Sequence, residues 1–168
     1  MESSALARFE AVVLPHLDAA YTLARYLMRN ASDADDVVQD ACLRALKYFD
    51  GFRGEAGTSA RAWLLTIVRN TAHTWRERHR PEALAVEFDE REHSEAIAER
   101  DPEAKETLGR ALERLAPEFR EVIVLRELQG LSYKEIGDVT GVPVGTVMSR
   151  LSRARARLQE ALREEEVR

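Results

Sequence analysis

Four arginines lie close together between Pro143 and Arg157, in a stretch near the C-terminus that contains no acidic residue. The guanidinium group of arginine binds phosphate and can donate two parallel hydrogen bonds to guanine. At the roughly 100° per residue of a helix, one side of this stretch carries Ser149, Ser152 and Arg153, flanked by Thr146, Arg150 and Arg157. Such a helix face predicts contact with DNA in the major groove.

The residues around this stretch predict the elements that position it. Ser132 and Glu135 have the spacing of a capping box, which marks the start of a helix. Gly141 follows at the place where a chain leaving a helix needs a left-handed residue. Pro143 then fits the first turn of the next helix, where its missing N–H costs nothing. Residues 131–158 therefore predict two helices joined by a tight turn.

The apolar residues of the same stretch predict which side of each helix is buried. The first helix has an apolar face made of Tyr133, Ile136 and Val139. In the second helix, apolar residues recur at the i, i+4, i+7 and i+11 positions, as Val147, Leu151, Ala154 and Leu158. The alternative is a surface corner whose arginines are only solvated. Agreement between cap, turn, periodicity and charge favours DNA binding.

Length and composition limit the class of protein. The chain has 168 residues, enough for one medium domain or two small ones. It contains no run of about 18 apolar residues that could cross a membrane. Its first residues, MESSALARFE, include acids where a signal peptide needs a basic start and an apolar run. Cys42 is the only cysteine, so no intrachain disulfide is possible, and we expect a cytoplasmic protein.

The net charge of −5 is unevenly distributed. Residues 1–80 hold 11 basic and 10 acidic side chains, residues 81–107 hold 3 and 10, and residues 108–168 hold 11 and 10. The surplus acid therefore lies in the middle segment, which has little apolar periodicity. Such a composition buries too little surface to offset the cost of ordering. It predicts a flexible acidic linker (81–107) between an N-terminal helical domain (1–80) and a C-terminal helix–turn–helix domain (108–168).

The N-terminal domain is predicted to be helical throughout, so that the fold class is all-α. Apolar residues recur with helical spacing over residues 6–27, and Pro15 is a candidate break. Ser32 and Asp33 are candidate N-caps for the helix that follows. That helix is predicted over residues 33–48, and a third helix is predicted over residues 59–78.

Three blocks of the sequence resemble the bacterial RNA polymerase sigma factors of the extracytoplasmic-function (ECF) group. DADDVVQDACLRAL (33–46) resembles the family's helix that binds core polymerase. FRGEAGTSARAWLLTIVRNTAHTWRERHR (52–80) is similar to the segment that melts and reads the minus-ten promoter element. LRELQGLSYKEIGDVTGVPVGTVMSRLSRARARL (125–158) is similar to the domain that reads the minus-thirty-five element. The blocks occur in the family's order and spacing.

The resemblance implies a polymerase-docking surface on the helix over residues 33–48. Its expected contacts with core polymerase are Asp36, Gln39, Asp40 and Leu43. An alternative for the first-turn acids is that they only suit the positive end of the helix dipole. Gln39 and Asp40, a full turn further into the helix, are less well explained in this way.

For the middle block the resemblance implies that non-template bases are held in protein pockets. Extruding a base from the duplex costs roughly a few kcal/mol of lost stacking. The pocket must therefore compensate with aromatic, amide and basic contacts to the base. Asn70 matches the position that helps to hold a flipped base. The other implied contacts are Phe52, Arg53, Arg61, Arg69, Trp75 and Arg76. Trp63 is assigned to the core, whereas core packing and base contact are both open for Phe52.

In the last block the resemblance implies promoter contacts by Arg126, Lys134, Thr146, Ser149, Arg150 and Arg153. Two positions depart from the family's pattern. Met148 stands where lysine or arginine is usual, and its apolar surface suits a thymine methyl. The promoter sequence recognised by this helix is therefore expected to differ from that of other family members. Gly137 replaces the usual alanine, which weakens its helix by about 1 kcal/mol and eases close packing.

The sequence predicts no catalysis, no cofactor and no metal site. It lacks a glycine-rich phosphate loop with lysine, and its histidines and cysteine do not have metal-ligand spacing. The predicted function is that of a promoter-specificity subunit. Its implied partners are core RNA polymerase, promoter DNA as duplex and as melted strand, and an anti-sigma factor, without membrane insertion. A conventional dimeric regulator and a purely structural helical adaptor are the alternative hypotheses.

Overall fold

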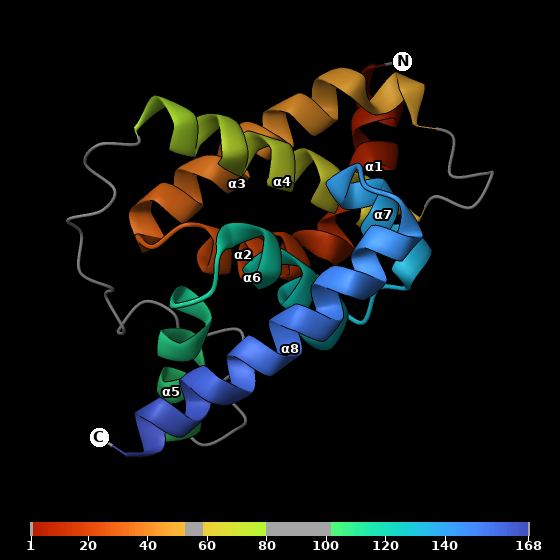
Figure 1. The fold of residues 1–168 in the computed structure, drawn as a ribbon. Coiled ribbons are helices and arrows are strands. Elements are labelled where there is room, and N and C mark those ends of the chain that lie inside the picture. Colours follow the sequence, from red (N-terminus) through yellow and green to blue (C-terminus); the bar gives the residue numbers. More distant parts are fainter. Residues whose placement is uncertain (1, 53–58, 80–101, 168) are drawn as a thin grey trace.

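The computed structural model describes residues 2–52, 59–79 and 102–167, and within these ranges all regular structure is helical (Figure 1). The all-α prediction is therefore confirmed. The first half contains α1 (Glu2–Val13), α2 (Leu17–Leu27), α3 (Ala31–Tyr48) and α4 (Ala60–Arg78). The second half contains α5 (Pro102–Glu113), α6 (Pro117–Ile123), a π-helical turn (Val124–Leu128), α7 (Tyr133–Thr140) and α8 (Val144–Glu166).

Proline and asparagine set the helix boundaries in the first half. The predicted break at Pro15 is confirmed, because a 3-10 turn over Leu14–His16 separates α1 from α2. The predicted N-caps Ser32 and Asp33 are wrong. Asn30 caps α3 instead, and its side-chain oxygen accepts the amides of Ser32 at 2.8 Å and Asp33 at 3.4 Å. An asparagine satisfies these free amides as well as the two predicted residues would, two to three positions earlier.

The first half is a bundle in which α2, α3 and α4 pack against one another and α1 closes one end. Its fully buried side chains include Leu23, Val37, Leu64 and Leu65. Each leucine of this kind contributes about 2 kcal/mol through burial of its apolar surface. The helical periodicity read from the sequence is thus the packing pattern of the bundle.

In the second half α8 packs along both α5 and α6. The buried Arg120 on α6 donates to the carbonyl oxygens of Leu112, Glu113 and Leu115, at 2.9, 3.1 and 2.9 Å, and so ties α6 to the end of α5. Because α5 begins at Pro102, residues 102–107 of the predicted linker are helical. Residues 81–101 lie outside the described part of the chain.

The two halves pack against each other. Contacts join α4 to α7 and α2 to α6, and the buried apolar residues form one continuous cluster through both halves. Figure 1 shows α6 beside α2 and α7 beside the start of α4. None of the helices in the described ranges is both long and apolar enough to cross a bilayer.

Candidate nucleic-acid interface

The predicted helix–turn–helix is formed by α7 and α8. The Glu135 amide donates to Ser132 Oγ at 3.1 Å and the Ser132 amide donates to Glu135 Oε1 at 3.0 Å, so the capping box is confirmed. Gly141 has the expected left-handed conformation, with φ of +75°. Pro143 lies just outside α8, as its N-cap, rather than in its first turn. Proline fits there too, since that position needs no intrahelical N–H.

The turn between α7 and α8 closes tightly over Gly137. The Gly137 carbonyl oxygen accepts the amides of Gly141 at 2.8 Å and Val142 at 3.2 Å. A Cβ atom on Gly137 would lie only 2.9 Å from the Val142 carbonyl oxygen. Alanine therefore cannot be accommodated without movement of the backbone, and the predicted close packing at this glycine is confirmed.

From Val144 to Arg157, the outer face of α8 is basic and carries no acid. Val147, Leu151 and Ala154 are buried, as predicted, and Leu158 is half-buried. On the opposite side Met148 is 53% exposed. The other outward residues are Ser149, Ser152 and Arg153, which are exposed, and Thr146 and Arg150, which are half-buried. This face can supply cations for phosphates, donors for base edges and one apolar contact.

Two predicted contact residues lie at the entrance to α7. Lys134 is exposed. Arg126 is half-buried, because its Nη1 donates to the Leu131 carbonyl oxygen at 2.8 Å and its guanidinium lies 4.7 Å from the centre of the Tyr133 ring. Arg126 therefore braces the chain entering the helix–turn–helix in this structure.

Most of the residues expected at the minus-ten element lie on α4. Ser59 caps this helix by accepting the Ala62 amide at 3.0 Å. Asn70 is exposed, and Arg61 and Arg76 are half-buried. Trp75 stacks on the ring of His79 with 4.6 Å between centroids, and its Nε1 is buried without an acceptor in the described part of the chain. Arg53 lies outside the described residues.

Phe52 belongs to an aromatic cluster in this structure. It is 9% exposed, and its ring centroid lies 4.9 Å from that of Trp63 and 6.1 Å from that of Phe49. Phe9 packs edge-on against Phe49 at 5.3 Å. Trp63 packs against the core, as predicted. For Phe52, core packing is the interpretation that this arrangement fits.

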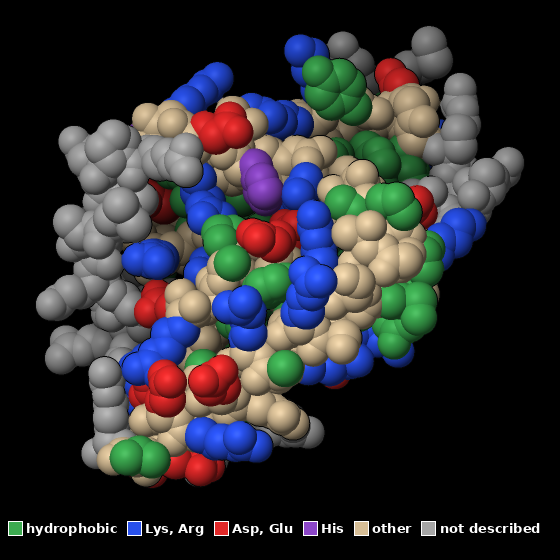
Figure 2. All heavy atoms as spheres, viewed as in Figure 1, with side chains coloured by type: hydrophobic (Ala, Val, Ile, Leu, Met, Phe, Trp, Pro, Cys, Tyr) green, Lys and Arg blue, Asp and Glu red, His purple; other side chains and the backbone are tan. Residues whose placement is uncertain are grey.

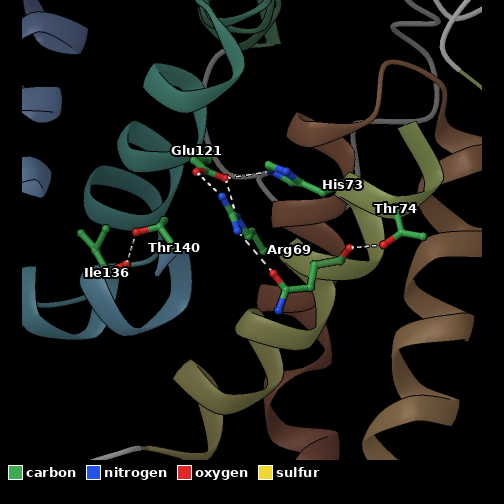
Figure 3. Close-up of polar contacts among 7 residues, drawn as sticks. Arg69, His73, Thr74, Glu121, Ile136 and Thr140 are labelled. Atoms are coloured by element: carbon green, nitrogen blue, oxygen red, sulfur yellow. Dashed lines mark hydrogen bonds and ion pairs between the residues drawn. The ribbon is translucent and has the colours of Figure 1, made fainter. Parts of the chain in front are cut away.

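Arg69 contacts the other half of the molecule rather than solvent. Its Nε donates to Glu121 Oε2 at 3.0 Å and its Nη2 to Glu121 Oε1 at 3.2 Å (Figure 3). The Nε2 atom of His73, one turn further along α4, lies 3.4 Å from Glu121 Oε2. Arg69 Nη1 also donates to Asn70 Oδ1 at 3.3 Å. A carboxylate on α6 thus engages two residues of α4 at once.

The Glu121 side chain is only 1% exposed. Burial by itself would raise the pKa of this carboxyl group, but hydrogen bonds from His73 and Arg69 outweigh burial and hold its pKa below the usual value. The charged form of Glu121 is therefore the stable one. Nothing in the sequence analysis predicted a role for Glu121 or His73. The available signal was an acid directly before the apolar run Val122–Leu125.

The predicted polymerase-docking residues lie along one solvent-facing side of α3. Asp36 and Gln39 are exposed, and Asp40 is half-buried and pairs with Arg44 at 3.3 Å. Leu43 is 68% exposed, and Leu46, one turn further along α3, is 45% exposed. Cys42 is half-buried, and burial raises the pKa of its thiol.

Comparison with protein families matches both halves of the chain. The model described as sigma-70 region 2 matches residues 12–82, and the model described as sigma-70, region 4 matches residues 105–158. Two helical domains that correspond to these regions, in this order, define the class as sigma-70-type transcription initiation factors.

Individual relatives narrow the class. The ECF RNA polymerase sigma factor SigE of Mycolicibacterium smegmatis is 34% identical over 167 residues, which cover 96% of this chain and 64% of SigE. The ECF RNA polymerase sigma-E factor of Haemophilus influenzae is 34% identical, with 83% of this chain and 79% of that protein covered. The RNA polymerase sigma-H factor of Pseudomonas aeruginosa is 33% identical, with 92% and 86% covered. The chain belongs to the ECF group of RNA polymerase sigma factors.

Solved structures agree with this assignment. The sigma factor RpoE of Bartonella quintana, in complex with the anti-sigma factor NepR, has a TM-score of 0.77 and 32% identity, over 93% of this chain and 97% of RpoE. CnrH in complex with the cytosolic domain of CnrY has a TM-score of 0.65 and 31% identity, over 93% and 88% of the two chains.

Proposed function

We propose that this chain binds core RNA polymerase and directs promoter-specific initiation, with α8 on the minus-thirty-five duplex and the α4 block on the minus-ten element. The observation that carries the proposal is the basic face of α8, free of acid from Val144 to Arg157 and held outward by a capped and tightly closed helix–turn–helix. A helix of this kind fits the major groove with its N-terminal residues against the base edges.

The solvent-facing side of α3 supports a protein partner. Leu43 and Leu46 are exposed beside the polar residues Gln39 and Asp40. An apolar patch rimmed by polar residues is typical of a protein–protein interface. We assign this surface, with Asp36, to core polymerase. Because core polymerase is intracellular, the proposal also places the chain in the cytoplasm.

The minus-ten surface is proposed to lie along α4 and the loop before it. Asn70 is exposed and can hold an extruded base through its amide, and Arg61, Arg69 and Arg76 can neutralise phosphates. Of these, Arg69 is engaged by Glu121 in the described arrangement. The chain itself supplies binding energy for opened DNA, while the chemistry of RNA synthesis belongs to the polymerase.

An anti-sigma factor is the proposed regulator. The RpoE and CnrH chains that this protein resembles are bound to NepR and to the cytosolic domain of CnrY. The resemblance extends over more than nine-tenths of this chain and so includes both of its domains. We therefore propose that an anti-sigma factor can bind to surfaces on both domains.

The test of the proposal is in vitro transcription with sigma-free core polymerase. Adding the purified chain should produce initiation at a specific promoter. Asp40→Arg should weaken core binding by about tenfold, equivalent to roughly 1.4 kcal/mol, and leave duplex DNA binding unchanged. Glu10→Arg, on the exposed side of α1, is the matched control. Binding of duplex DNA without any stimulation of core polymerase would favour the dimeric regulator instead.

Asn70→Ala separates promoter opening from promoter binding. Loss of the amide should reduce the fraction of melted promoter, measured by permanganate reactivity of thymines, more than it reduces closed-complex formation. Equal loss in both measurements would mean that Asn70 does not hold an extruded base.

A further inference from the structure

We infer that Glu121 is an interdomain latch, which holds the two halves of the chain closed and keeps Arg69 from DNA until they separate. The inference rests on the proposed function, because Arg69 belongs to the proposed minus-ten surface. Its structural part, closure by Glu121, can be tested without polymerase or DNA.

In the latch, most of the hydrogen-bonding nitrogens of Arg69 are already engaged. Its Nε and Nη2 donate to the two oxygens of Glu121, and its Nη1 donates to Asn70. A bidentate arginine–carboxylate pair has the geometry that a phosphate would also require. A phosphodiester can therefore bind Arg69 fully only after Glu121 has left. The contact also engages Asn70, the proposed base-holding residue.

The surroundings of Glu121 make its negative charge necessary for closure. Burial lowers the pKa of the neighbouring Arg120 to about 10, together with the positive charges of Arg76 and Arg29. Arg76 on α4 and Arg29, which follows the end of α2, therefore lie close enough to Arg120 on α6 to affect its pKa. Figure 2 shows lysine and arginine side chains gathered in the middle of this face, around a histidine and an acidic group. Without the Glu121 charge, closure would leave the Arg69 guanidinium, whose side chain is only 19% exposed, without its carboxylate partner.

Two further hydrogen bonds between the halves, in the described part of the chain, are weaker than the latch. Gln129 Nε2 donates to the Ala19 carbonyl oxygen at 3.3 Å, and Ser59 Oγ donates to Glu135 Oε2 at 3.1 Å in an exposed position. Neither bond joins two opposite charges. Opening the molecule returns Glu121, Arg69 and His73 to water together, so the latch can release without leaving a buried unpaired charge.

The experiment measures the distance between the halves in the full chain. Spin labels are placed on cysteines at Asp35→Cys on α3 and Glu160→Cys on α8, both exposed, in a Cys42→Ser background. The latch is removed from one side by Glu121→Gln and from the other by Arg69→Gln with His73→Gln. Glu118→Gln, an exposed acid on the same helix, is the matched control.

Wild type and Glu118→Gln should show one short separation. Both latch variants should shift the ratio of open to closed molecules by roughly tenfold or more, a typical coupling between sites. If Glu121→Gln does not fold, as judged by its helical circular dichroism, the double variant on α4 carries the test. Distance distributions identical to wild type in the folded variants would overturn the inference.

A second measurement tests whether closure is inhibitory. In transcription with core polymerase, Glu121→Gln should lower the concentration of chain needed for half-maximal initiation several-fold. This factor should be about as large as the shift in the ratio of open to closed molecules. An opened molecule with an unchanged half-maximal concentration would overturn the inhibitory role. If even wild type gives no initiation while Glu121→Gln still opens the molecule, the proposed function fails and closure by Glu121 is supported.

Discussion

Gly137 occupies a position where one added methyl group would change the stability of the helix–turn–helix domain. Gly137→Ala should gain about 1 kcal/mol in helix propensity. Against this, the new Cβ atom would lie 2.9 Å from the Val142 carbonyl oxygen, and overpacking of this kind costs about 1–3 kcal/mol. We expect net destabilisation of about 1 kcal/mol, measured from the urea midpoint by circular dichroism.

Gly145 is the matched control for this substitution. It lies in the first turn of α8, and its added Cβ atom would meet nothing within 4 Å. Gly145→Ala should therefore raise the free energy of unfolding by about 0.5–1 kcal/mol, because it restricts the unfolded chain. An equal stabilisation by both alanines would show that the turn is not closed as tightly as the structure indicates.

Met148 is predicted to tune the base preference of α8. Met148→Arg should add one phosphate or guanine contact, because the side chain is exposed on the proposed DNA-facing side. One added phosphate contact would steepen the slope of log affinity against log salt by about 0.9. Selection from randomised minus-thirty-five duplexes should also move one position from thymine towards guanine. Gln159→Arg, further along α8, adds the same charge and should leave base preference unchanged.

The helices of the first half and the helix–turn–helix follow local signals in the sequence. Periodicity, the break at Pro15 and the caps at Ser59 and Ser132 place their boundaries within about one turn. The N-cap of α3 was predicted at Ser32 or Asp33 but lies at Asn30. Asn30, Ser32 and Asp33 can all cap a helix, so local propensity alone does not choose between them.

The capping box of α7 should make the stability of this helix depend on pH. The pKa of Glu135 is held below its usual value, chiefly by the Ser132 amide, with Ser59 and Ser132 hydroxyls adding to the effect against a smaller effect of burial. Because the pKa of Glu135 is lower in the folded than in the unfolded chain, its charged form stabilises the fold at pH values above the usual glutamate pKa. This stabilisation is lost as pH falls through the lowered pKa.

Glu135→Gln should therefore flatten the acid side of the stability profile. The urea midpoint of wild type should fall more between neutral pH and pH values below the usual glutamate range than the midpoint of the variant does. Glu160→Gln, an exposed acid on α8, should follow wild type. A wild-type profile that matches that of Glu135→Gln would contradict the role of the box.

Cooperativity between the halves can be read from intrinsic probes. Both tryptophans, Trp63 and Trp75, lie on α4, so their fluorescence reports the first half, while helical circular dichroism reports both. Because one apolar cluster runs through both halves, wild type should unfold in coincident transitions by the two probes. Glu121→Gln should separate the two midpoints, and Glu118→Gln should not. Separate transitions in wild type would mean that the halves are not coupled.

The amino-acid sequence by itself determined the fold class and the helix–turn–helix, because these depend on short-range spacing, and the resemblance of three sequence blocks indicated the family. Capping residues, turn glycines and apolar periodicity act within a few residues of one another. Their consequences at Gly137 and Gly141 could be predicted before the structure was known.

Only the tertiary structure determined which residues of one half contact which residues of the other. Arg69 and Glu121 are 52 positions apart, and no local pattern pairs one arginine of α4 with one acid of α6. The burial of Phe52 against Trp63 was likewise open in the sequence, because an aromatic ring suits both a core and an extruded base. Long-range pairing depends on how whole helices pack, and packing is determined by the shapes and charges of all the faces together.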